Sequence, residues 1–115
     1  MKDLAPLPEN WRAAPTPHEG EWTPPAFVGV KIVCAANRTA DGYVFAGARH
    51  FDPIMRNQAM LAGVDLFGSE EGFIDQFGRF WNRRQAMEIC HIEGQPVDVA
   101  RQGGHTSILF SEGLY

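Results

Sequence analysis

The pattern of hydrophobic and polar residues predicts two β-hairpins. Residues 27–36, FVGVKIVCAA, are rich in Val and Ile, and residues 43–47, YVFAG, follow after the turn sequence TADG. Short β-branched runs joined by such a turn are typical of a hairpin. A second, shorter pair is predicted further along, with GFID at 72–75 and RFW at 79–81 joined by QFG.

Capping signals predict two helices. Residues 53–62, PIMRNQAMLA, begin at an Asp-Pro pair, a typical N-cap and first helical position, and precede a glycine. Residues 83–93 follow Asn82, which forms an asparagine version of the capping box with Gln85, and also precede a glycine. SILF at 107–110 is predicted to be a last strand. The order β-β-α-β-β-α-β predicts an α+β domain with two helices packed on a small, mostly antiparallel sheet.

The first 26 residues differ from the rest of the chain. They hold six of the eight prolines and show no apolar period, although Trp11 and Trp22 are present. We predict that residues 1–26 form an extended arm, held by its tryptophans to the body or to a neighbouring subunit. Residues 27–115 are predicted to form a single α+β ligand-binding domain.

Charge and hydropathy restrict the partners. The net charge of −4 argues against binding of long nucleic acids, which depends on a basic surface. No apolar run reaches the length of about 18 residues that spans a membrane, and the N-terminus lacks a secretory signal, so a cytoplasmic location is expected. Eight of the ten cationic residues are arginines, whose planar forks bind phosphate, so a small anionic ligand remains possible.

Aromatic and arginine side chains are concentrated in EGFIDQFGRFWNRRQAMEIC, residues 71–90. Arg83 and Arg84 lie in the first turn of the predicted helix, where the helix dipole disfavours cations. A phosphate bound there would reverse this effect, and Phe73 or a neighbouring ring could stack a base. Two interpretations stay open, an anion cradle or a hairpin with core phenylalanines and solvated arginines.

A second candidate site lies at the end of the predicted strand 43–47, where Arg49 and His50 precede a capped helix. Strand ends that face helix starts commonly build ligand sites, although surface or structural roles are the alternative. No metal-ligand spacing and no nucleophile elbow is present, and Cys34 and Cys90 are expected to be buried thiols. No cofactor and no metal site is predicted.

The order of the segments adds a resemblance. GARHFD is followed by a helix, then by GFIDQFGRFWNRRQAMEI, by EGQPV and by a terminal LFSEGLY. Over residues 28–115 this resembles the first class of Thoeris anti-defence proteins, a phage family. The chain departs from that family in ending SEGLY instead of SEDLY, in the insertion RQGGHT, and in Trp81 before the helix cap.

The resemblance implies a non-enzymatic sponge in the host bacterial cytoplasm. Such proteins capture glycocyclic ADP-ribose signals, and some members bind cyclic oligonucleotides, with sites between the chains of a dimer or hexamer. By motif, Phe73 would stack the adenine, Asn82 would contact the ligand, and Arg49 and His50 would contact phosphate. Arginines of the second hairpin, of the following helix and of the C-terminal segment are added to these. The predicted ligand-binding residues are therefore Arg49, His50, Phe73, Arg79, Asn82, Arg83 and Arg101.

Two alternatives remain. A small phosphodiesterase or ADP-ribose hydrolase would use His50 and Asp52, and its products would be seen after incubation with nucleotide. An interaction module would block a host protein through the arm at residues 1–26.

Overall fold

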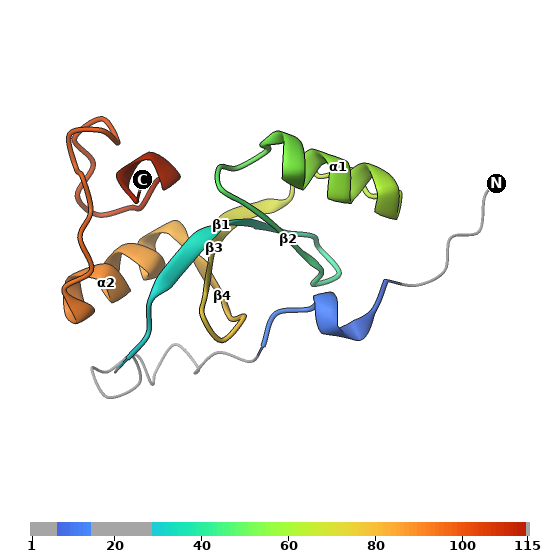
Figure 1. Ribbon diagram of the computed structural model, residues 1–115, viewed down its shortest axis with the longest axis horizontal. Helices are drawn as coiled ribbons and strands as arrows, with labels where there is room; N and C mark the ends of the chain where they lie inside the picture. Colours follow the sequence, from blue (N-terminus) through green and yellow to red (C-terminus); the bar gives the residue numbers. More distant parts are fainter. Residues whose placement is uncertain (1–6, 15–28, 115) are drawn as a thin grey trace.

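The computed structural model describes residues 7–14 and 29–114, in which a four-stranded antiparallel sheet carries two helices (Figure 1). The strands are β1 (Ile32–Arg38), β2 (Val44–Gly47), β3 (Glu70–Asp75) and β4 (Phe80–Asn82), in the sheet order β2-β1-β3-β4. The helices are α1 (Pro53–Ala62) and α2 (Arg83–Glu93), and two short 3-10 turns are η1 (Glu9–Trp11) and η4 (Ser111–Gly113). The α+β class predicted from the sequence is confirmed.

Both helices begin and end where predicted. At the start of α2, Asn82 Oδ1 accepts the Gln85 N–H at 2.8 Å and Gln85 Oε1 accepts the Asn82 N–H at 3.0 Å, which completes the capping box. Asp52 caps α1 by accepting a backbone N–H of its first turn at 2.8 Å. Gly63 and Gly94 end the helices with φ of 69° and 66°, left-handed values that glycine adopts without strain.

Both predicted hairpins are confirmed, but their strands start at different residues. β1 begins at Ile32, whereas the predicted strand spans residues 27–36. Of these, residues 27 and 28 lie outside the described part of the chain. Two hydrogen bonds of 2.8 Å join the backbone of Ile32 to the side-chain amide of Gln95, which replaces a strand partner there. β3 begins at Glu70, two residues before the predicted start at residue 72, so Glu70 and Glu71 are also strand residues.

One face of the sheet carries both helices. Asn37 pairs with Phe45, and Ala35 pairs with Phe73, so these side chains share a face because strand side chains alternate. Phe45 belongs to the buried cluster under α1, and Phe73 belongs to the cluster under α2. Between the clusters, Asn37 and Glu71 lie opposite each other on β1 and β3. A polar strip therefore separates two apolar packing areas.

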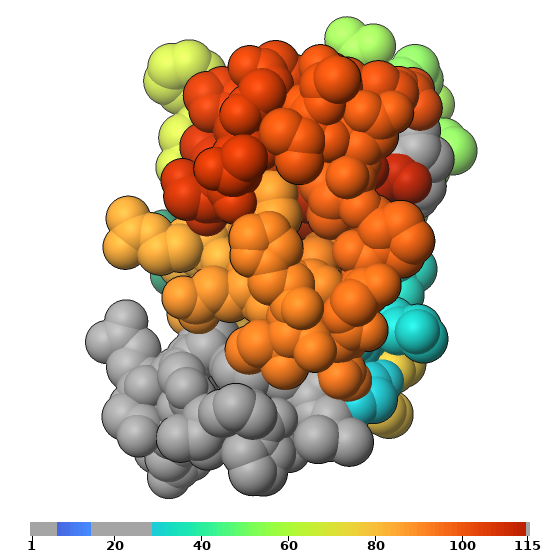
Figure 2. All heavy atoms as spheres, turned by 90° about the vertical axis from the view of Figure 1, so that its left-hand side faces the viewer, coloured from blue at the N-terminus to red at the C-terminus, as the bar shows by residue number. Residues whose placement is uncertain are grey.

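The predicted last strand at 107–110 is wrong. The buried side chain of Gln102 donates from Nε2 to the carbonyls of His105 and Ile108 at 2.7 and 3.0 Å, and its Oε1 accepts the Phe110 N–H at 3.0 Å. One amide thus satisfies backbone groups that a sheet would otherwise pair. The C-terminal segment instead packs beside α2, and the two form one continuous surface (Figure 2).

Replacing Gln102 by alanine should lower the free energy of unfolding by about 2–4 kcal/mol, because three hydrogen bonds of about 1 kcal/mol each are lost in a buried place. Chemical denaturation measures the loss. Gln58→Ala, at an exposed position of α1, is the control and should change stability by no more than about 0.5 kcal/mol. Equal effects of the two substitutions would contradict the structural role of Gln102.

The described part of the arm packs on the body. The ring of Trp11 meets that of Phe45 edge-on at 5.9 Å between centroids, and the Ala14 N–H donates to Gly78 O at 3.0 Å. A groove of about 660 Å³ lies between this segment and the two hairpins. The packing expected of Trp11 is confirmed, whereas Trp22 lies outside the described residues.

Both cysteine thiols are free, with Cys34 half-buried and Cys90 buried. Burial raises the pKa of Cys90 to about 11, so its reactive thiolate form is scarce at neutral pH. Within residues 7–14 and 29–114, no helix has the length and apolar content needed to cross a bilayer.

Candidate functional site

The aromatic rings of the β3–β4 hairpin do not form one cradle. Phe73 and Trp81 pair in register and are buried under α2. Phe80, one position away on β4, points to the opposite face, where the Arg38 guanidinium lies 4.4 Å from its ring centre. Phe77 is exposed at the hairpin turn. The hairpin therefore divides its rings between the core under α2, a buried position on the opposite face of the sheet, and the exposed turn.

The stacking role expected for Phe73 does not fit this conformation. Its side chain is 0% exposed, with the His50 ring edge-on at 5.2 Å and the Arg83 guanidinium 5.9 Å from its centre. A base would reach the Phe73 ring only if these neighbours moved. A Phe73→Ala substitution would open a core cavity and would be a poor probe of ligand binding.

Two of the predicted arginines lie away from the other candidates. Arg79 Nε donates to Asp75 Oδ2 at 2.7 Å at the end of β3, four residues from Glu71 and so about 13 Å along the strand. Arg101 is exposed in a turn where its backbone N–H donates to Asp98 at 3.1 Å. The predicted ligand role of both stays a prediction, without support from shared geometry.

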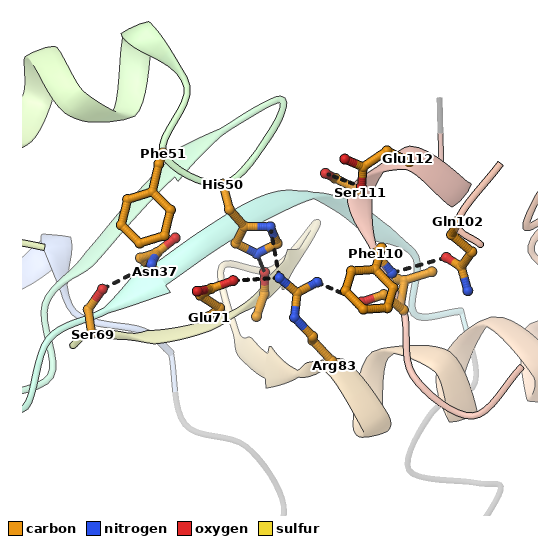
Figure 3. A network of polar contacts seen from close by, with 12 residues as sticks. Asn37, His50, Phe51, Ser69, Glu71, Arg83, Gln102, Phe110, Ser111 and Glu112 are labelled. Carbon is orange, nitrogen blue, oxygen red and sulfur yellow. Dashed lines mark hydrogen bonds and ion pairs between the residues drawn. The ribbon is translucent and has the colours of Figure 1, made fainter. Parts of the chain in front are cut away.

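Arg83 is the centre of a cluster that the fold does bring together (Figure 3). Its Nη2 donates to Glu71 Oε1 at 2.6 Å and its Nη1 donates to Leu109 O at 2.9 Å. The guanidinium lies 4.5 Å from the centre of the Phe110 ring. The start of α2, the strand β3 and the C-terminal segment therefore meet at one side chain that is 20% exposed.

His50 adds a neutral ring to this cluster. Its Nε2 lies 2.7 Å from Gly72 O, and because a carbonyl only accepts, Nε2 carries the hydrogen. Nδ1 then presents a lone pair 3.4 Å from Arg83 Nη2. Burial, with a smaller effect of the Arg83 charge, lowers the pKa of His50. The imidazole is therefore neutral at pH 7 and orients the guanidinium.

Arg49 reaches the Arg83 cluster from the end of β2. Its Nη1 donates to Ser111 O at 3.1 Å, in η4, while its backbone N–H donates to Asp52 Oδ2 at 3.2 Å. Burial raises the pKa of Asp52, but hydrogen bonds from several backbone N–H groups outweigh burial and lower it. The Asp52 carboxylate is thus engaged as the cap of α1. Asn82 likewise uses its side chain in the capping box.

Sequence reasoning missed three residues of this region. Glu71 was not identified as a site residue, and Phe110 was assigned to a strand that does not form. Asn37 is 0% exposed and directly follows the apolar run IVCAA, so a polar residue at the end of that run was the available signal. In the described part of the chain, no group of three or more His, Cys, Asp or Glu residues has the arrangement of a metal site.

The cluster has the chemistry to bind a small anion. A guanidinium fork pairs bidentately with phosphate or carboxylate, and the neutral His50 and the flat Phe110 ring hold the Arg83 fork in place. The present partner of Arg83 is Glu71, whose side chain is 41% exposed and can turn toward solvent. An incoming phosphate would compete with the Glu71 carboxylate for the Arg83 fork.

The fold and the Arg83 cluster define the class of this protein: it is a small α+β domain with a polar cluster between its two helices. The family model described as Phage T4 y16D protein matches residues 31–115, and the chain belongs to this bacteriophage protein family. The matched range runs from the start of β1 to the C-terminus and leaves the arm outside. No curated protein and no solved structure matches the chain.

Proposed function

We propose that this phage protein binds a cyclic nucleotide signal, glycocyclic ADP-ribose or a cyclic oligonucleotide, and withholds it without cleaving it. The observation that carries the proposal is the convergence of Arg83, His50 and Arg49 where β2, β3, α2 and the C-terminal segment meet. Both guanidiniums donate to backbone carbonyls of that segment, which keeps them in place before a ligand arrives. Preorganisation of this kind reduces the cost of binding.

Capture then needs no reacting group. A phosphate of the ligand takes the position of the Glu71 carboxylate against Arg83, and Arg49 supplies a second fork at the same junction. Such charge-assisted hydrogen bonds are roughly twice as strong as neutral ones. The side chains that a hydrolase would use are engaged elsewhere, Asp52 in the helix cap and His50 Nε2 with Gly72 O.

Self-association is part of the proposal. On and beside α1, four large apolar side chains are mostly exposed, namely Ile54 (62%), Met60 (70%), Leu61 (85%) and Phe67 (91%). Exposed apolar side chains gathered around one helix commonly mark an interface. A second copy packed against α1 would cover these side chains and bring two ligand sites into one dimer or hexamer.

Native mass spectrometry of the full chain with glycocyclic ADP-ribose, cyclic di-AMP and a cyclic tri-adenylate tests the proposal. We expect a homo-oligomer that retains at least one of these molecules at a defined stoichiometry. Heating the complex should release the nucleotide chemically unchanged, as judged by chromatography. Cleavage products would contradict sequestration in favour of hydrolysis, and a protein that binds none of the three would contradict nucleotide capture itself.

A further inference from the structure

Asn37 has a buried hydrogen-bond acceptor without a partner. Its Nδ2 donates to Ser69 Oγ at 2.9 Å, whereas no described residue donates to its Oδ1. The assignment of the two amide atoms follows from Ser69, whose hydroxyl donates to Leu66 O at 2.6 Å and so has only a lone pair left for Asn37. An unpaired acceptor that is 0% exposed is costly, and a hydrogen-bond donor of a ligand would remove that cost.

The Phe51 ring points toward Asn37 (Figure 3), and its backbone has an unfavourable conformation. Its φ of 58° is left-handed, which is an outlier for an aromatic residue. The side chain is 38% exposed, and Figure 3 shows its ring pointing toward Asn37, on the side away from Ser69. Strain of this kind persists where surrounding structure enforces it, and it often marks ligand sites.

Phe51 also lines a groove. A groove of about 500 Å³ between α1 and the following loop is lined by Phe51, Arg56, Leu66 and Phe67. This volume lies in the range of small-molecule sites, about 300–1,000 Å³. Leu66 connects the groove to Asn37, because Leu66 lines the groove and its carbonyl accepts the Ser69 hydroxyl that binds Asn37 Nδ2. The Phe51 ring therefore has room to move away from Asn37.

The acceptor lies one cross-strand pair from the guanidinium cluster. Asn37 is in register with Glu71, the partner of Arg83, and directly opposed Cβ atoms in an antiparallel pair are about 4.5–5.5 Å apart. A molecule that places a phosphate on Arg83 thus has its neighbouring sugar and base within reach of Asn37.

We propose, on the basis of the function inferred above, that Asn37 and Phe51 form an adenine subsite. The Phe51 ring swings toward the groove and stacks on the base, and Asn37 Oδ1 accepts a hydrogen bond from the exocyclic amino group. The combination of a flat ring and a buried acceptor fits a base, whereas a ribose hydroxyl would need no ring. This subsite replaces the adenine stacking expected of the buried Phe73.

Calorimetry of the full chain with glycocyclic ADP-ribose and with its hypoxanthine analogue tests the subsite. The analogue carries an acceptor oxygen in place of the amino donor, so it would face Asn37 Oδ1 with a second acceptor. We expect the wild-type protein to bind the adenine form about tenfold more tightly or better. Asn37→Leu should erase this preference by weakening the adenine form alone.

Ser69→Ala is the matched control, because it removes the partner of Asn37 Nδ2 and leaves Oδ1 in place. It should keep the adenine preference. Equal affinity of the wild-type protein for both molecules would overturn the subsite and would indicate that a water molecule satisfies Asn37. A preference that persists in Asn37→Leu would also overturn it. If Asn37→Leu does not fold, the wild-type comparison alone decides.

Phe51→Gly separates stacking from amide recognition. Glycine adopts a positive φ without strain, so the thermal midpoint should stay the same or rise. Affinity for both molecules should fall about tenfold, with the adenine preference unchanged. Unchanged affinity would overturn the role of Phe51. If the wild-type protein binds neither molecule and no cyclic oligonucleotide, the proposed function falls together with the subsite, whereas equal binding removes the subsite only.

Discussion

Replacing Asp75 by alanine is expected to lower the free energy of unfolding by about 3–5 kcal/mol. The side chain of Asp75 is 0% exposed, and its Oδ2 accepts hydrogen bonds from Arg79 Nε at 2.7 Å and Trp81 Nε1 at 2.8 Å. Its Oδ1 accepts the backbone N–H groups of Phe77 and Arg79 at 2.8 and 3.0 Å. Removal of the carboxylate leaves a largely buried cation and several donors without a partner. Since small domains are stable by about 5–15 kcal/mol, much of the total would be lost.

Denaturation in guanidinium chloride measures this change. Glu70→Ala is the matched control, because Glu70 also forms a 2.7 Å ion pair, with Arg38, but both partners are more than a third exposed. It should cost no more than about 1 kcal/mol. If Asp75→Ala were as mild as Glu70→Ala, the carboxylate would not be what holds the β3–β4 hairpin together.

Arg83→Gln should weaken nucleotide capture about 100-fold or more, on the assumption that the proposed function is correct. The substitution removes a charged fork that donates to a phosphate, and loss of one partner of such a pair costs about 2–5 kcal/mol. Glutamine keeps a donor for Leu109 O, so the fold should survive. Isothermal calorimetry with glycocyclic ADP-ribose gives the affinity, and a thermal melt checks the fold.

Arg84→Gln is the control for this measurement, since Arg84 is the next residue, carries the same charge and is exposed on α2. Its effect should stay within about threefold, as expected when a surface charge acts only through screened, long-range attraction. If both substitutions weakened binding equally, the arginines would act as a general positive field, and the cluster around Arg83 would not be a built site.

The parts of the fold that depend on local chemistry were predictable. The Asp52-Pro53 pair and the capping box of Asn82 and Gln85 fix the starts of both helices, and the glycines after them fix the ends. These signals act over three or four residues, so a single sequence contains all the information needed. Hairpin strands were found for the same reason, through short alternating runs next to a turn.

The candidate site was only partly predictable because long-range contacts decide it. The sequence identified Arg49, His50 and Arg83 as candidates. It contained no signal that these three residues come together in one cluster. Phe73 was assigned to ligand stacking, although the register with Ala35 turns it into the core. The prediction of a last strand was wrong because the side chain of Gln102, several residues away, forms hydrogen bonds with the backbone of that segment.

The connection between β2 and α1 is tightly packed. A Cβ at Gly47 would lie 2.5 Å from Asp52 Oδ1, and the same carboxylate holds the Arg49 N–H. A shift of the strand end, which carries His50, would therefore also shift the start of α1 and its apolar side chains. If copies associate through α1, ligand affinity and assembly are reciprocally linked, and each would strengthen as the other proceeds. Under the proposed function, a higher concentration of the protein would then tighten ligand binding.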